Sequence, residues 1–251
     1  MAAVVSPGPS VPASRLADAD RWADPARPFL TFYDDRTGER TELSARTTAN
    51  WVAKTANLGT DLLDLRAGDS VRLAVPSHWM VVVWTLAAVT AGWAVRPADP
   101  DGPTDPVDVL VGDAAGLRAP AAASARELVG VSTAPLARAF GPDLPAGALD
   151  YAAEVAGCAD VFASADDPAA VQAANAPVLA DAAAAADRLG LRPGSRLLVG
   201  IDPASTRGLV EAVLAPVLAT ASIVLVAGVV AGSARWHRLA TTEDVTLELT
   251  D

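Results

Sequence analysis

The stretch LRAGDSVRLAVPSHW, residues 65–79, has a close counterpart in LRPGSRLLVGIDP, residues 191–203. Each stretch reads Leu-Arg-x-Gly, then an acidic or small residue, then an apolar run that ends at or near a proline. Glycine readily adopts the left-handed backbone that ends many helices, so Gly68 and Gly194 each predict a helix C-terminus. The apolar runs that follow predict buried strands. The chain therefore contains the same helix-to-strand junction twice.

Each junction is followed by a second apolar segment with the length of a helix and a strand. The first copy runs from residue 70 to residue 99, with Pro76 in its turn, and the second runs from residue 195 to residue 228, with Pro203 in its turn. A strand, a crossover helix and a parallel strand form a unit typical of sheets that are covered on both faces. The sequence therefore predicts an α/β fold of two similar lobes with mainly parallel sheets and βαβ units.

A hairpin is expected before the first junction, in FLTFYDDRTGERTELS, residues 29–44. Its centre, DDRTG, has the residue types that favour turns. Ser44 is a suitable N-cap for the helix that follows, which we expect to end near Leu63.

The domain organisation follows from these elements. Residues 1–24 are rich in Pro, Ala and Ser and predict a disordered tail. Residues 25–251 form a single domain, with lobe one at about 25–113, a connecting region at 114–157 and lobe two at about 158–251.

Composition limits the classes of partner. The formal net charge is −11, which repels phosphate backbones and anionic lipid, so nucleic acid is not an expected partner. The single cysteine, Cys158, excludes an internal disulfide and a multi-cysteine metal site, and its apolar setting predicts a buried thiol. Residues 73–95 and 209–232 are long enough to span a bilayer, but they divide naturally into strand, turn and helix, so no membrane span is expected.

The hairpin, the helix, the run GDSVRLAVPSHWMVVVWTLAAVTAGWAVRPADP and then DVLVGD resemble, in this order, the opening of AMP-binding, adenylate-forming enzymes. This superfamily includes acyl-CoA synthetases, luciferases and nonribosomal peptide adenylation domains. The resemblance covers about residues 25–230 and implies the fold of that family's N-terminal region, here in a short, degenerate form that suits an actinobacterial composition.

The resemblance also implies where a phosphate-binding loop would lie. The family holds ATP in a loop rich in Ser, Thr and Gly that ends in Pro-Lys-Gly, because small residues let backbone N–H groups approach the anion. The equivalent segment is VFASADDPAAV, residues 161–171. It keeps Ser164 and Pro168, has no glycine, and has Ala169 in the place of the lysine.

Two carboxylates, Asp166 and Asp167, also occupy this degenerate phosphate loop. They would repel a polyphosphate unless a metal intervened. A pair of aspartates could hold Mg²⁺, but an exposed acidic turn is the more common meaning of such a pair, so no metal site is assigned. The family's later nucleotide-binding segments and its small C-terminal domain would lie beyond residue 251.

Other candidate ligand-binding residues are few. His78 opens the first apolar helix and either caps it or points into a cleft between the lobes. Arg207 lies at the turn of the second lobe, where a cation near a helix N-terminus could bind an anion. His237 is expected on the surface. The sequence has no nucleophile elbow and no glycine-rich dinucleotide motif, so no catalytic residue is assigned.

These observations predict a non-catalytic relative of adenylate-forming enzymes that acts as a binding, regulatory or scaffold protein in the cytoplasm. Self-association or a protein partner is expected, and no cofactor is assigned. Two alternatives remain open: the cleft retains a nucleotide, acyl or pantetheine ligand such as ATP, AMP or CoA, or a partner chain completes an acyl-CoA synthetase-like enzyme.

Overall fold

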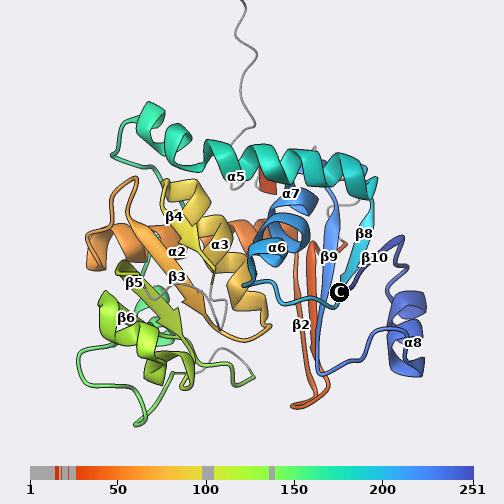
Figure 1. Cartoon of the computed structure of the whole chain (residues 1–251), viewed down its shortest axis with the longest axis horizontal. Coiled ribbons are helices and arrows are strands. Elements are labelled where there is room, and N and C mark those ends of the chain that lie inside the picture. Colours follow the sequence, from red (N-terminus) through yellow and green to blue (C-terminus); the bar gives the residue numbers. More distant parts are fainter. Residues whose placement is uncertain (1–14, 17, 19–21, 23–26, 98–104, 136–138) are drawn as a thin grey trace, which may run out of the picture.

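The computed structural model describes residues 15–16, 18, 22, 27–97, 105–135 and 139–251, which form two five-stranded sheets with helices between and outside them (Figure 1). The strands are β1 (Leu30–Asp34), β2 (Glu39–Leu43), β3 (Ser70–Ala74), β4 (Ala94–Arg96), β5 (Val107–Gly112), β6 (Ala125–Gly130), β7 (Leu149–Asp150), β8 (Arg196–Val199), β9 (Ser222–Ala227) and β10 (Leu247–Leu249). The helices are α2 (Ala45–Leu62), α3 (Trp79–Ala91), η2 (Gly116–Arg118), η3 (Pro120–Ser124), α4 (Tyr151–Val155), α5 (Pro168–Leu189), α6 (Thr206–Gly208), η4 (Leu209–Leu214), α7 (Ala215–Ala219) and α8 (Ala234–Thr242).

Both sheets are mainly parallel. Sheet A has the strand order β10-β8-β9-β1-β2, and only its β1–β2 pair is antiparallel. Sheet B has the order β4-β3-β5-β6-β7, and all of its pairs are parallel. The predicted fold class, two α/β lobes with mainly parallel sheets, is confirmed.

The pairing of the hairpin differs from the predicted lobe boundaries. Strand β1 pairs with β9 of the second lobe, so the hairpin at residues 29–44 belongs to sheet A and not to the lobe at 25–113. Every residue of β1 is buried, as a strand with neighbours on both edges and layers on both faces requires. The connecting region at 114–157 likewise supplies β6 and β7 of sheet B.

Most of the tail predicted for residues 1–24 lies outside the described residues, and its disorder stays a prediction. Of the residues described there, Leu16 is buried, and the Arg15 guanidinium donates a hydrogen bond of 2.7 Å to the Leu218 carbonyl.

The repeated sequence forms the same turn in both sheets. Gly68 and Gly194 have φ angles of 99° and 84°, in the left-handed region that favours glycine. The Gly68 N–H donates to the carbonyl of Gly92 (2.9 Å), and the Gly194 N–H donates to the carbonyl of Thr220 (3.1 Å). Gly92 and Thr220 are the C-caps of the two crossover helices. Each turn therefore joins the start of one βαβ unit to the end of its crossover helix.

The residue after each glycine closes the turn with its side chain. The Asp69 carboxylate accepts from the Arg66 N–H at 2.9 Å, and the Ser195 hydroxyl accepts from the Arg192 N–H at 3.0 Å. The acidic or small residue at this position is therefore explained by local hydrogen bonding. A helix is followed by a strand in both copies, as predicted, but the prediction that Gly68 and Gly194 end the helices is wrong. Helix α2 ends at Leu62 with Leu63 as its C-cap, and α5 ends at Leu189 with Gly190 as its left-handed C-cap, so the two glycines form the turn that leads into each strand.

The layers follow the alternation of side chains along the strands. Residues such as Phe32 and Leu197 face the helices between the sheets, whereas Tyr33 and Leu198 face α8 on the outer side of sheet A. The outer face of sheet B is covered by η2 and η3, where Leu117 packs against Leu110. The order of layers is thus η2 and η3, sheet B, a shared helix layer, sheet A and α8 (Figure 1).

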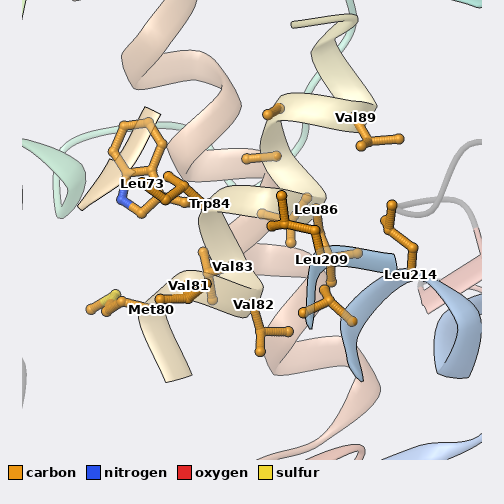
Figure 2. Close-up of a cluster of buried hydrophobic side chains, with 14 of the residues drawn as sticks. Leu73, Met80, Val81, Val82, Val83, Trp84, Leu86, Val89, Leu209 and Leu214 are labelled. Carbon is orange, nitrogen blue, oxygen red and sulfur yellow. The ribbon is translucent and has the colours of Figure 1, made fainter. Parts of the chain in front are cut away.

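Helix α3 lies at the centre of the shared layer. All 13 of its residues are buried, as expected for a helix without a polar face. Figure 2 shows Trp84 beside Leu73 of β3 and Leu86 on the side of η4, near Leu209. The segments at residues 73–95 and 209–232 are βαβ crossovers, as predicted. No helix among the described residues is both long and apolar enough to cross a membrane.

The crossover helix of the second copy is divided in the structure. It consists of α6, a π-helical segment η4 and α7. Pro216 has no N–H and cannot extend the regular hydrogen-bond ladder, so the preceding turn widens, and the Ala215 N–H bonds to the Val210 carbonyl.

A buried ion pair joins α8 to sheet A. The Arg196 guanidinium donates to the Glu243 carboxylate and, at 2.9 Å, to the Thr31 hydroxyl. Tyr33 also donates to Glu243 at 2.5 Å. Burial raises the pKa of the Glu243 carboxyl, but the hydrogen bonds from Tyr33 and Arg196 outweigh it and hold this pKa below its usual value.

The Arg196→Ala variant tests this ion pair. The substitution leaves a buried carboxylate without its cation, and we expect the free energy of unfolding to fall by about 3–5 kcal/mol. Urea denaturation measures the change. The matched control is Arg235→Ala, which removes the more exposed pair with Asp35 and should cost less than about 1 kcal/mol. Equal losses in the two variants would contradict this account of the pair.

Candidate functional site

Residues 161–171, which the resemblance identifies with a degenerate phosphate loop, lead directly into α5. Asp167 is the N-cap of this helix, and its carboxylate accepts from the Ala169 N–H at 2.9 Å. Pro168 is the first helical residue, where its missing N–H costs no helical hydrogen bond. The sequence Asp-Asp-Pro is therefore a helix start, which agrees with the acidic turn favoured by the sequence.

The remaining polar side chains of the loop bind the protein itself. Asp166 accepts from the Ala67 N–H at 2.8 Å, which fixes the loop to the Leu-Arg-x-Gly turn of the first lobe. The Ser164 hydroxyl accepts from the Asp166 N–H at 3.1 Å. Ala169, in the place of the family's lysine, is exposed on the first turn of α5 and carries no charge.

This geometry has a direct consequence for anion binding. In a phosphate loop, backbone N–H groups point at the ligand and a cation balances its charge. Here carboxylate oxygens occupy the N–H groups of Ala67 and Ala169, and the two aspartates add negative charge. In this conformation these two N–H groups are not free to bind a polyphosphate, and the loop offers it no counter-charge.

His78 lies in the core and not in a cleft. Its Nδ1 atom accepts from the Met80 N–H at 3.3 Å, so the ring caps α3 and carries its proton on Nε2. The Nε2 atom lies 3.7 Å from a Glu39 carboxylate oxygen. Burial lowers the pKa of His78 to about 4, and the nearby Glu39 carboxylate opposes this shift only in part. The imidazole is therefore neutral at physiological pH.

Arg207 is held by neighbouring acceptors. Its Nε atom lies 2.8 Å from the Glu211 carboxylate, and its guanidinium also donates to the Thr250 carbonyl at 3.0 Å. Burial raises the pKa of Glu211, but hydrogen bonds from Arg207 and Arg188 outweigh it and lower this pKa. An anion at Arg207 would have to displace a carboxylate.

The three candidate ligand-binding residues, His78, Ser164 and Arg207, lie on different elements. No hydrogen bond, ion pair or ring contact among the described residues joins any two of them. His237 is exposed on α8, as predicted, whereas Cys158 is half-buried, with a thiol pKa raised by burial. The described part of the chain contains no cluster of three His, Cys, Asp or Glu side chains that could hold a metal ion.

A pocket of about 530 Å³ lies between α2 and α4, and we call it the α2–α4 pocket. Sequence analysis missed it because its two walls come from segments about 100 residues apart; the apolar face of α2 that contains Trp51 was the one available signal. Its lining residues are Thr47, Asn50, Trp51, Lys54, Tyr151, Ala152, Val155, Ala156 and Asp160.

A smaller hollow of about 230 Å³ lies beyond the carboxyl ends of β5 and β6, next to Asp113, Ser132 and Asp143. This edge of a parallel sheet is a common place for ligands. The Asp113 carboxylate is already bonded to the N–H groups of Ala115 and Gly116.

The pKa of His78 predicts a pH dependence of stability. Above about pH 6.5 the ring is neutral in both the folded and the unfolded chain. Between about pH 6.5 and pH 4 only the unfolded ring takes up a proton, so stability falls across this range as the pH falls. The His78→Asn variant is the control, because it keeps a capping side chain that does not titrate. Between about pH 6.5 and pH 4 the unfolding free energy of the native chain should fall by up to about 3 kcal/mol more than that of the variant. Parallel pH profiles of the unfolding free energy would contradict this assignment.

The cap at Asp167 makes a second prediction. Asp167→Ala should lower the free energy of unfolding by about 1 kcal/mol, whereas Asp167→Asn, which can still accept the Ala169 N–H, should lower it less. Asp181→Ala, at an exposed position of the same helix, should change it by no more than about 0.5 kcal/mol. Urea denaturation of the three variants measures these differences, and an Asp167→Ala variant as stable as the native chain would show that the cap is not needed.

Comparison with solved structures shows the fold. The chain matches an acyl-CoA synthetase of Brucella canis with a TM-score of 0.71 and 19% identity, over 95% of this chain and 47% of that one. It matches the acetoacetyl-CoA synthetase of Streptomyces lividans with a TM-score of 0.66 and 19% identity, over 94% and 42% of the two chains. The anthranilate CoA ligase AuaEII, solved with anthranoyl-AMP, gives a TM-score of 0.65 and 15% identity, over 97% and 49%. The chain thus has the adenylate-forming fold predicted from the resemblance and spans about half the length of these enzymes.

Sequence comparison gives the family. No family model matches the chain. A TIGR03089 family protein of Mycobacterium tuberculosis (strain ATCC 25618 / H37Rv) is 37% identical over 230 residues, which are 87% of this chain and 90% of the relative. At this identity and coverage, the chain belongs to the TIGR03089 family.

Proposed function

We propose that this chain is a non-catalytic member of the adenylate-forming fold that acts by binding, as a regulatory or scaffold protein, and does not activate carboxylates. The observation that carries the proposal is the structure of residues 161–171. Asp167 caps α5, Asp166 binds the Ala67 N–H, and the family's lysine is replaced by Ala169. These contacts support a structural role for the segment.

Opening the segment for a phosphate would require the loss of both carboxylate contacts. Each is a charge-assisted hydrogen bond to a backbone N–H, and the loss of the exposed helix cap at Asp167 alone is expected to cost about 1 kcal/mol. Even then, no side chain of the loop would balance the charge of a triphosphate, because residues 161–171 contain no lysine or arginine. Binding without adenylation is therefore the function that fits the loop best.

We extend the proposal to a protein partner or a second copy of the chain, and to a cytoplasmic location. Leu62 and Val161 support a contact surface, since both are exposed apolar side chains with relative exposures of 51% and 79%. They belong to the end of α2 and to the segment bonded to it through Asn57. A single half-buried cysteine suits a reducing compartment.

ATP–pyrophosphate exchange with a panel of aliphatic and aromatic carboxylic acids tests the proposal. We expect exchange at the level of a protein-free blank for every acid, because the loop cannot hold the triphosphate. An active acyl-CoA synthetase in the same buffer is the positive control. Exchange above the blank with any acid would overturn the proposal.

Thermal-shift measurements distinguish the proposal from the alternative in which the cleft still binds a nucleotide, acyl or pantetheine ligand. The compounds tested are ATP, AMP, CoA and an acyl-CoA. The proposal expects no shift of the midpoint with any of the four compounds. A concentration-dependent rise with one of them would favour the retained-ligand alternative, because a ligand that binds only the folded chain raises its stability.

A further inference from the structure

One face of α2 is covered along only half of its length. Thr47, Asn50, Trp51 and Lys54 are spaced three and four residues apart, so they share this face. The segment at residues 156–161 covers the C-terminal half of the face. The N-terminal half is open, and there the side chains line the α2–α4 pocket.

Side chains of α2 hold this covering segment in place. Lys54 donates to the carbonyls of Ala156 (3.3 Å) and Cys158 (2.5 Å). Asn57 donates to the carbonyls of Ala159 (2.9 Å) and Val161 (3.0 Å). These hydrogen bonds therefore fix the boundary of the pocket.

The wall of the pocket is aromatic and well supported. Trp51 stacks on Tyr151, with ring centroids 6.4 Å apart, and contacts Trp79 edge-to-face at 5.5 Å. The Tyr151 hydroxyl is bonded to the Thr55 hydroxyl at 2.7 Å within the core. The Tyr151 hydroxyl therefore has its hydrogen-bond partner inside the protein, and Tyr151 contributes its aromatic ring to the wall of the pocket.

The rim of the pocket carries no net charge. The Lys54 ammonium lies 3.0 Å from the Asp160 carboxylate, so these two charges neutralise each other. The Asn50 carboxamide is half-buried and makes no hydrogen bond with any of the residues that the structure describes. A carboxamide provides both an acceptor oxygen and donor N–H groups. The open polar group at the pocket is therefore a neutral donor–acceptor pair.

We propose that the α2–α4 pocket binds an uncharged, flat aromatic molecule with a donor–acceptor edge, such as a carboxamide or lactam. The ring lies against Trp51 and the methyl groups of Ala152 and Ala156, and the edge pairs with the Asn50 carboxamide. The volume of about 530 Å³ falls in the range of small-molecule sites. The site is separate from residues 161–171, so the proposal holds whether or not the chain adenylates a substrate.

Titration with indole-3-carboxamide, followed by ¹H–¹⁵N correlation spectra of the full chain, tests this proposal. We expect saturable shifts confined to residues 47–54 and 151–160. Indole, which lacks the edge, should bind about fivefold more weakly, as the loss of one hydrogen bond predicts. Indole-3-carboxylate should also bind more weakly than the amide, because Asp160 keeps Lys54 from acting as its counter-ion.

Variants separate the ring contact from the edge contact. Asn50→Ala should weaken binding of the carboxamide about fivefold and leave binding of indole unchanged. Ala152→Trp, which fills the pocket from α4, should abolish binding of both compounds. The matched control is Ala153→Trp, at the neighbouring exposed position that does not line the pocket, and it should bind as the native chain does.

Three results would overturn the proposal: no saturable shifts at about 10 mM carboxamide, near the limit of weak fragment binding; saturable shifts outside the two segments; or tighter binding of the carboxylate than of the amide. None of these results depends on the pyrophosphate exchange measurement, so failure here is distinguishable from failure of the proposed function.

Discussion

Helix α3 is buried along its whole length, and the arrangement of the molecule follows from the need to cover it. A helix with no polar face cannot lie on a surface, so it must have apolar partners on every side. Sheet B and α2 supply some of these contacts, and η4, α5 and β1 of the other half supply the rest. The two sheets therefore share one helix layer and one continuous core, instead of forming two separate domains. Asn175 of α5 adds a polar contact, because its side-chain amide donates a hydrogen bond to the Val89 carbonyl of α3.

Local features of the sequence predicted local features of the structure. The left-handed turns at Gly68 and Gly194, the cap at Ser44, the burial of α3 and the hairpin depend on residues that are close in the chain, and all four are present. The helices themselves end earlier than predicted, with C-caps at Leu63 and Gly190. The strand partners could not be predicted in the same way. Pairing of β1 with β9 joins segments nearly 200 residues apart, and nothing in the sequence of β1 specifies which buried edge it will meet. The widening of the helix before Pro216 also depends on how the surrounding core accommodates a missing donor.

The candidate site was predictable only in part. Sequence alone placed the degenerate phosphate loop and favoured an acidic turn, and the structure adds the reason for each aspartate: one caps a helix and the other binds Ala67. That second contact spans 99 residues, which no local pattern reports. The α2–α4 pocket could not be predicted for the same reason, because its walls come from segments far apart in the chain. Its aromatic wall requires Trp51 and Tyr151 to meet, and helical spacing shows only that Trp51 lies on a face that packs against something.

The same loop links architecture and function. The resemblance to adenylate-forming enzymes implies that this position carries a loop rich in Ser, Thr and Gly that ends in Pro-Lys-Gly. In this chain it is a short connection with its side chains bonded on both sides, next to the turn that ends α2. Such a connection strengthens the contact between the two lobes, and its two aspartates occupy the N–H groups of Ala67 and Ala169. This arrangement supports the proposal that the chain acts through its surfaces and pockets and not through phosphate chemistry.

The central claim is that residues 161–171 serve the fold and not a nucleotide. The most direct measurement is a titration of the ¹⁵N-labelled chain with Mg·ATP, observing the backbone amides of Ala67 and of residues 163–170 other than Pro168. We expect these resonances to stay in place at millimolar nucleotide. Saturable shifts of Ala67 and Ala169 together, which would show that the two aspartates release their N–H groups to a phosphate, would contradict it.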